Sequence, residues 1–210
     1  MNQPAKPTIT NLQNRQAYGI IESFSHDEVI PVTRKYLFRA NAPNLLYLLV
    51  NLCAFAFAAR LIFYGESLLG DKLSYLGVGF LSTFLVLVPV HEYVHFFAYR
   101  FCGAKNVRVE YRWRQMSALC IADDFIVSGK NFVFVALAPF VVVNSIILLA
   151  CLYGSDNVRI FLSGALISHV AACSGDVGLV NLVWLSRRFQ TWTYDDSSNQ
   201  TSYFFREIAN

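Results

Sequence analysis

Charged residues are scarce in this chain of 210 residues, in which Asp, Glu, Lys and Arg make up only 15%. A soluble domain usually carries about 25%. The scarcity is uneven, because long uncharged runs alternate with short charged ones, and 55% of the residues are hydrophobic. This pattern argues against a soluble globular domain and favours a protein that crosses a membrane several times.

The chain also lacks features that would indicate other classes of protein. It has no basic run and no basic–aromatic stripe, so no nucleic-acid partner is expected. Its five cysteines are odd in number and include no CxxC pair, so no disulfide framework is predicted and we interpret them as small apolar residues. The first 40 residues hold no early apolar run, so no signal peptide is predicted.

Four apolar stretches are long enough to cross the hydrocarbon core as helices, which takes about 20 residues. They cover residues 45–64, 75–101, 132–153 and 160–185. The connection after the second stretch contains VRVEYRW and SALCIADDFIVSG, which indicate either paired strands at the membrane surface or an amphipathic interfacial segment. We therefore expect an all-α polytopic membrane protein with about four transmembrane helices and a short β-hairpin-like interfacial segment after the second.

Basic residues gather on one side of these spans. The connection over residues 100–131 holds six of them, Arg34, Lys35 and Arg39 lie just before the first span, and two adjacent arginines follow the last. The positive-inside rule then places both termini and the long middle connection in the cytoplasm. The predicted organisation is a cytoplasmic N-terminal segment (1–44), a transmembrane core (45–185) and a cytoplasmic tail (186–210), in which the polar stretch TYDDSSNQTS (193–202) is expected to be mobile. A bacterial inner membrane is the expected lipid bilayer.

The second span contains an HExxH sequence, in which His91, Glu92 and His95 are the fixed positions. Residues four apart lie on one face of a helix, so both imidazoles can bind one ion. Zinc binds neutral imidazole well, and Glu92 can act as general base toward a zinc-bound water. Such a short pattern also arises by chance, but ionisable groups inside an apolar helix are costly and a metal ion compensates that cost. The motif therefore predicts a Zn²⁺ site.

Two histidines leave the ion under-coordinated, and the fourth span offers His169 and Asp176 as a third ligand. Asp176 and His91 each lie about 16 residues from the start of their spans, which enter the membrane from the same side. At about 1.5 Å rise per residue the two are level, whereas His169 is roughly 10 Å further out. Asp176 is therefore the predicted ligand, with a structural carboxylate as the alternative, and His169 is expected to hydrogen-bond within the bundle.

Other polar or helix-bending residues of the spans have simpler interpretations. Arg60 lies near the outer end of the first span and can extend to the interface, with gating or substrate contact as the alternative. Asn144 is expected to form a hydrogen bond between helices, with peptide binding as the alternative. Pro89 and Pro139 are each expected to kink their helix.

The motifs resemble a known family. HEYVHFFAYRFCGAKNVRV, which begins at His91, is similar to the HExxH helix and following strand of the putative zincin peptidase family, which is related to the site-2 proteases. ALAPFVVVN resembles that group's proline-bearing third span, and CSGDVGLVN resembles its late span with an acidic ligand. The resemblance covers residues 85–185. The chain departs from site-2 proteases proper, which carry Leu-Asp-Gly where this chain has Ser-Gly-Asp-Val, and it shows no PDZ or CBS domain.

The residues and the resemblance together predict an intramembrane zinc metalloprotease that hydrolyses peptide bonds of membrane-associated substrates. Glu92 is the predicted catalytic residue, and His91, His95 and Asp176 are the predicted metal ligands. The region 117–126 is a candidate for binding an extended substrate as an added strand. The alternatives are a zinc-binding membrane carrier and a catalytically inactive membrane scaffold. The sequence indicates no oligomeric state.

Overall fold

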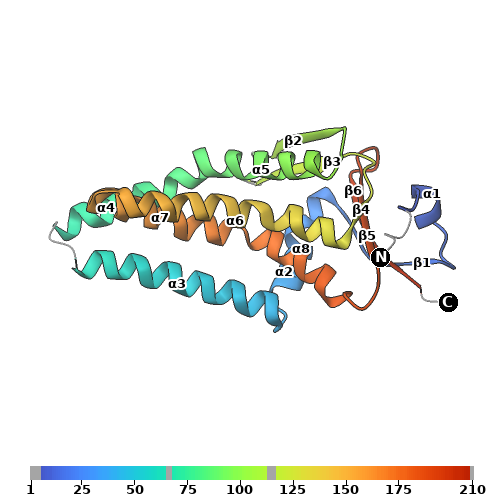
Figure 1. Cartoon of the computed structure of the whole chain (residues 1–210), viewed down its shortest axis with the longest axis horizontal. Coiled ribbons are helices and arrows are strands. Elements are labelled where there is room, and N and C mark those ends of the chain that lie inside the picture. Colours follow the sequence, from blue (N-terminus) through green and yellow to red (C-terminus); the bar gives the residue numbers. More distant parts are fainter. Residues whose placement is uncertain (1–5, 65–67, 113–116, 209–210) are drawn as a thin grey trace.

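The computed structural model describes residues 6–64, 68–112 and 117–208, which form a helical bundle with two small antiparallel sheets at one end (Figure 1). The helices are α1 (Ile9–Leu12), α2 (Val29–Leu37), α3 (Ala42–Tyr64), α4 (Leu69–Ser82), α5 (Val88–Phe101), α6 (Gly129–Tyr153), α7 (Asp156–Ala172) and α8 (Ser174–Leu185). Two shorter elements lead into helices: the 3₁₀ turn η1 (His26–Glu28) directly precedes α2, and the π-helical turn η2 (Thr83–Leu87) joins α4 to α5.

Four helical stretches are long and apolar enough to cross a membrane, as predicted from the four apolar stretches of the sequence. They are Ala42–Tyr64, Leu69–Phe101, Gly129–Tyr153 and Asp156–Leu185. Each ends at the predicted residue and begins a few residues earlier than predicted. Ser128 shows why, because its side chain accepts from the N–H of Asn131 and caps the third span within sequence too polar for a hydropathy signal.

The outer faces of the bundle are apolar. In the most apolar part of α3, which has a mean hydropathy of 2.1, only 11% of the residues are buried inside the protein. Soluble monomers rarely expose apolar surface on this scale. The helix faces therefore suit contact with lipid.

The second span is one helical stretch made of α4, η2 and α5. Pro89 lies in the first turn of α5, directly after the π turn. Proline has no N–H and its ring crowds the carbonyl four residues earlier, so the regular bonding pattern cannot continue through it. Pro89 was expected to kink this helix, and the structure shows a π turn directly before it, a feature common next to functional sites.

Helices α4 and α7 approach each other through a reciprocal pair of glycines. A Cβ on Gly79 would lie 1.9 Å from the carbonyl oxygen of Phe161, and one on Gly164 would lie 2.1 Å from that of Leu76. Each helix therefore offers a glycine to the backbone of the other, as in close-packed membrane helices. This contact fixes α7 beside the second span.

The smaller sheet is the hairpin predicted after the second span. It consists of β2 (Val107–Arg112) and β3 (Ser117–Ala122), with Val107 opposite Ala122. In Figure 1 the hairpin lies along α5. The sequence therefore predicted its place and its antiparallel character correctly.

The larger sheet was not predicted, and it corrects the all-α fold class. It contains β1 (Tyr18–Ser25), β4 (Val127–Ser128), β5 (Thr191–Asp196) and β6 (Thr201–Glu207), in the antiparallel order β1-β6-β5-β4. Strands β5 and β6 include six residues of the stretch 193–202 that was expected to be mobile, and that prediction is wrong for residues 193–196 and 201–202. Aromatic side chains of both strands are buried on two faces of the sheet. Trp192, Tyr194 and Phe205 pack with Leu12 and Ile126, whereas Phe204 belongs to the main core of the bundle.

Both sheets lie at the same end of the bundle, and the turn between α6 and α7 lies at the other (Figure 1). Strands β1 and β6, which are close to the two ends of the chain, are neighbours in the larger sheet. An even number of spans brings the ends together in this way, in agreement with the predicted count of four.

Candidate metal centre

The structure brings together the three residues predicted as metal ligands. Nε2 of His91 lies 3.0 Å from Oδ2 of Asp176, and Nε2 of His95 lies 3.3 Å from Oδ1 of the same carboxylate. The two Nε2 atoms are 3.1 Å apart. Both imidazoles are 7% exposed. Side chains from α5 and α8 thus converge on one buried point, with separations that allow a shared metal ion.

Asp176 reaches this point because the fourth span is divided into two helices. Helix α7 ends at Ala172, and Asp176 lies in the first turn of α8. A carboxylate in a first turn interacts favourably with the N-terminal end of the helix dipole. On the next turn, Gly178 lets α2 pack closely, since a Cβ there would lie 2.5 Å from the carbonyl oxygen of Thr33. Helix α2 therefore supports α8 directly behind the carboxylate.

The chemistry of the converging groups fits a cation. Nδ1 of His95 is 2.9 Å from the carbonyl oxygen of Val135, which can only accept, so this nitrogen carries the proton. In the neutral imidazole the Nε2 lone pair of His95 then faces a carboxylate oxygen of Asp176, so that two acceptors meet and a cation between them would satisfy both. Zinc binds neutral imidazole and carboxylate together, with one position left for water in catalytic sites. The residues present are therefore suited to hold Zn²⁺.

Glu92 lies beside this point and does not take part in the convergence. It lines a cavity of about 100 Å³ together with His95 and Asp176. Its carboxylate also lies next to the backbone N–H of Cys120 on β3. Because Ala118 on β3 lines the same cavity, this strand forms one of its walls. The centre thus combines a candidate base with a strand along which an extended chain could lie.

Cys120 is the thiol of this cavity. Burial, with the nearby carboxylates of Glu92 and Asp195, raises the pKa of the Cys120 thiol far above its usual range. Because the thiolate is the nucleophilic form of cysteine, Cys120 is unreactive at neutral pH. Among the groups that line the cavity, Glu92 is therefore the better candidate for activating a nucleophile.

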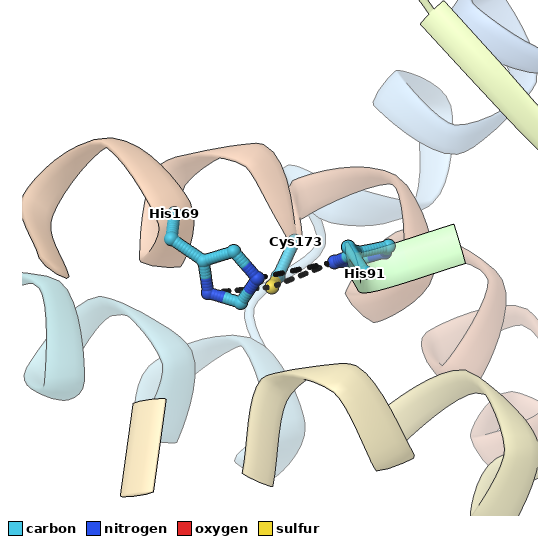
Figure 2. A group of neighbouring side chains, drawn as sticks. All are labelled: His91, His169 and Cys173. Carbon is cyan, nitrogen blue, oxygen red and sulfur yellow. Dashed lines mark hydrogen bonds between the residues drawn. The ribbon is translucent and has the colours of Figure 1, made fainter. Parts of the chain in front are cut away.

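The second ring nitrogen of His91 faces another buried group, shown in Figure 2. Nδ1 of His91 lies 3.3 Å from Nε2 of His169 and 3.9 Å from Sγ of Cys173. Nδ1 of His169 in turn lies 2.8 Å from Oδ1 of Asn144. His169 and Cys173 are fully buried, and His91, His169 and Cys173 could also hold a metal ion.

This second group was only partly anticipated. The expected hydrogen bonds of His169 within the bundle and of Asn144 between helices are both present, as one bond between α6 and α7. Cys173 was interpreted as a plain apolar residue, and its position beside two imidazoles was missed. Its spacing of four from His169 was an available signal, since such residues share a helix face. Arg60 lines a separate cavity with Arg159, away from the metal centre.

Comparison with known proteins gives one match. No curated protein and no solved structure matches the chain. A family model described as "Putative zincin peptidase" matches residues 84–191, just over half of the chain. The matched range runs from η2 through α8 to the start of β5, so it contains the HExxH motif, the β2–β3 hairpin and Asp176. The chain therefore belongs to the putative zincin peptidase family.

Proposed function

We propose that this protein is an intramembrane zinc metalloprotease that hydrolyses peptide bonds of membrane-associated substrates. The observation that carries the proposal is the buried convergence of His91, His95 and Asp176 beside Glu92. Ionisable groups at membrane depth mark functional sites, and these match the ligand types of catalytic zinc. Membership of a zincin peptidase family supports peptide hydrolysis over other uses of the metal.

The proposed reaction assigns a separate role to each side chain. When bound by His91, His95 and Asp176, a zinc ion supplies Lewis acidity and lowers the pKa of a bound water to about 7. Glu92 accepts a proton from the attacking water and later donates it to the leaving amine. Burial of the two imidazoles, together with their contacts to Asp176, keeps these groups in fixed positions, so little reorganisation is needed during the reaction.

The substrate is proposed to bind as an extended segment along β3. Within the part of the chain that the structure describes, β3 pairs along its length with β2 alone, and it forms a wall of the cavity that contains Glu92. A transmembrane helix hides its amide bonds, so a substrate must unwind before it can be cut. Addition of a strand to β3 would present such a segment next to Glu92. If proline at Ala118 or Leu119 leaves cleavage unaltered, this binding mode is wrong.

We further propose that the protein lies in a bacterial inner membrane with both termini in the cytoplasm. The four apolar helical stretches support a membrane location. The six basic residues between positions 100 and 131 support this orientation. Substrates would then be unwound and bound at the cytoplasmic side of the bilayer.

The test compares the wild type with Glu92→Gln and His95→Ala, each purified in detergent. Bound zinc is measured by mass spectrometry, and cleavage is followed by mapping new N-termini in membranes from cells that express each variant. Glu92→Gln is expected to retain one zinc ion and to lose cleavage by about 10²- to 10⁴-fold, the usual contribution of a general base. His95→Ala is expected to lose both. Glu110→Gln is a matched control, because Glu110 pairs with Arg108 on the exposed side of the hairpin.

The outcomes separate the protease from the other functions considered. A carrier would bind zinc, and its function would not depend on Glu92. A scaffold would function without zinc. If Glu92→Gln cleaves at the wild-type rate, the proposed mechanism is wrong.

A further inference from the structure

We propose that Asn144 and His169 form a hydrogen-bond relay that holds His91 in the tautomer with its proton on Nδ1. The relay leaves the Nε2 lone pair of His91 directed at the metal position. The proposal rests on the metal site proposed above and adds the residues that set up one of its ligands. Asn144 and His169 are then positioning residues, and neither binds the metal.

The relay begins at a backbone carbonyl. Nδ2 of Asn144 donates to the carbonyl oxygen of Phe140, one turn earlier in α6, over 2.7 Å. This bond fixes the orientation of the amide, so its oxygen Oδ1 faces Nδ1 of His169 at 2.8 Å. An amide oxygen can only accept, and therefore Nδ1 of His169 carries the proton.

The bond between Asn144 and His169 determines the proton positions of both imidazoles, those of His169 and His91. A neutral imidazole has one donor and one acceptor nitrogen, so Nε2 of His169 is an acceptor. It lies 3.3 Å from Nδ1 of His91, which therefore donates. Nε2 of His91 is left with its lone pair, next to Asp176 at 3.0 Å. The direction of every bond is thus set by the carbonyl of Phe140, which has no proton to give.

Burial makes the relay important for metal binding. Asn144 and His91 are each 7% exposed and His169 is fully buried, so water cannot easily replace a lost bond. Groups that fix the tautomer of a metal-binding histidine typically contribute a factor of 10 to 100 in metal affinity. Helix α6, which carries Asn144, also fixes the tautomer of His95, because the carbonyl of Val135 on this helix accepts from Nδ1 of His95. Helix α6 therefore orients both imidazoles although it supplies no ligand.

Cys173 offers a competing use of the same nitrogen (Figure 2). Its Sγ lies 3.9 Å from Nδ1 of His91 and 3.9 Å from Nδ1 of His169. A metal ion held by these three residues would need the lone pair of His91 at Nδ1, which moves the proton to Nε2 and removes His91 from the first centre. The two arrangements exclude each other for neutral His91, so an experiment can decide between them.

The test measures zinc affinity of the full-length protein in detergent by competition with a chromogenic chelator. Asn144→Leu removes both amide contacts at similar volume and is expected to weaken zinc binding by about 10- to 100-fold. His169→Phe is expected to do the same, whereas His169→Gln keeps an acceptor for His91 and is expected to restore most of the affinity. Asn51→Leu is a matched control, because Asn51 makes the same bond to a carbonyl one turn earlier, that of Tyr47 on α3.

Two spectroscopic readouts complete the test. In metal-free protein at alkaline pH, ¹⁵N shifts of labelled His91 should show the proton on Nδ1, and Asn144→Leu should give a mixture of tautomers. With Co²⁺ in place of zinc, the wild type should bind one ion without a thiolate charge-transfer band, and Cys173→Ala should leave the spectrum unchanged.

Each contrary result has a distinct meaning. Wild-type affinity in both Asn144→Leu and His169→Phe would overturn the relay. So would a thiolate band that disappears in Cys173→Ala, which would instead assign a metal to Cys173. If Asn144→Leu does not fold, the contrast between His169→Gln and His169→Phe decides the question. A wild-type protein without zinc affinity would refute the proposed function, while the ¹⁵N shifts would still test the relay.

Discussion

His95 and Val135 are joined by a hydrogen bond of 2.9 Å, from the ring nitrogen Nδ1 to the backbone carbonyl oxygen. In a regular helix that carbonyl would accept from the N–H four residues later. The residue at that position is Pro139, which has no N–H. The proline in α6 therefore leaves a backbone acceptor available at the depth of the candidate metal centre, and His95 uses it.

Pro139→Ala should weaken zinc binding. The alanine restores an N–H that competes with His95 for the carbonyl of Val135, so the preferred tautomer of His95 is held less firmly. We expect zinc affinity to fall by up to about 10-fold, the lower end for loss of a partner of a metal ligand, while α6 itself becomes more stable. Chelator competition measures the first effect and thermal unfolding the second.

Pro43→Ala provides the control for this substitution. Pro43 lies in the first turn of α3, where an added N–H would have no helical partner in any case. Its zinc affinity should equal that of the wild type. If Pro139→Ala binds zinc as tightly as Pro43→Ala, the carbonyl of Val135 is not important for the metal centre.

Gly79→Ala should separate α4 from α7. The added Cβ would lie 1.9 Å from the carbonyl oxygen of Phe161, and backbone cannot move aside as a flexible side chain can. We expect a loss of stability of about 1–3 kcal/mol or more, as for other overpacked sites. Gly77→Ala on the same helix is the matched control, because a Cβ there meets no atom within 4 Å. Unfolding in mixed detergent measures both variants, and equal stabilities would contradict the proposed close packing.

The sequence predicted the elements whose signals are local. Apolar length located the four spans and their ends, and the spacing of His91 and His95 placed both on one helix face. The estimate of depth selected Asp176, which the structure places next to both imidazoles. These placements share one cause, because helical rise and periodicity convert position in the chain directly into position in space.

The larger sheet could not be predicted because its pairing is not local. Tyr18 on β1 lies opposite Glu207 on β6, so the partners come from opposite ends of the chain. The segment containing β5 and β6 is rich in polar residues and resembles a mobile tail when viewed alone. Strand formation there depends on packing against neighbours, which outweighs local preference.

The surroundings of the metal centre were missed for a related reason. The role of the Val135 carbonyl depends on which face of α6 meets α5. The role of Cys173, which directly follows α7, depends on how the end of that helix meets His91. Periodicity shows which residues share a face but not which helix covers that face. Every residue has a backbone carbonyl, so the residue type does not indicate which carbonyl accepts a hydrogen bond from a side chain.

Glu22→Gln should reduce the loss of stability in acid. Oε2 of Glu22 accepts hydrogen bonds of 2.6 Å from both Lys35 and Tyr36. Burial alone would raise the pKa of Glu22, but these bonds and the charge of Lys35 outweigh burial and lower it below 4.5. A carboxyl group of lowered pKa stabilises the fold above its unfolded value, and that stability is lost as the pH falls through the folded value.

We therefore expect the free energy of unfolding to decrease below about pH 4.5, with a smaller decrease in Glu22→Gln. Because the Lys35 side chain is 53% exposed, the contribution should stay under about 1 kcal/mol. Lys35→Met should remove much of the same pH dependence of the free energy of unfolding. Combining it with Glu22→Gln should reduce that dependence little further. Additive effects of the two substitutions would show that the ion pair does not cause the acid sensitivity.

Fusion reporters should place both sheets in the cytoplasm. Six basic residues between positions 100 and 131 oppose translocation of that connection, and four spans return the chain to the side on which it began. Green fluorescent protein fused after residue 210 should fluoresce, whereas alkaline phosphatase inserted at Ser155, between α6 and α7, should be active. The controls exchange the two reporters. Alkaline phosphatase fused after residue 210 should be inactive, and green fluorescent protein inserted at Ser155 should not fluoresce. Active phosphatase at the C-terminus would reverse the orientation, and substrates would then have to reach β3 from outside the cell.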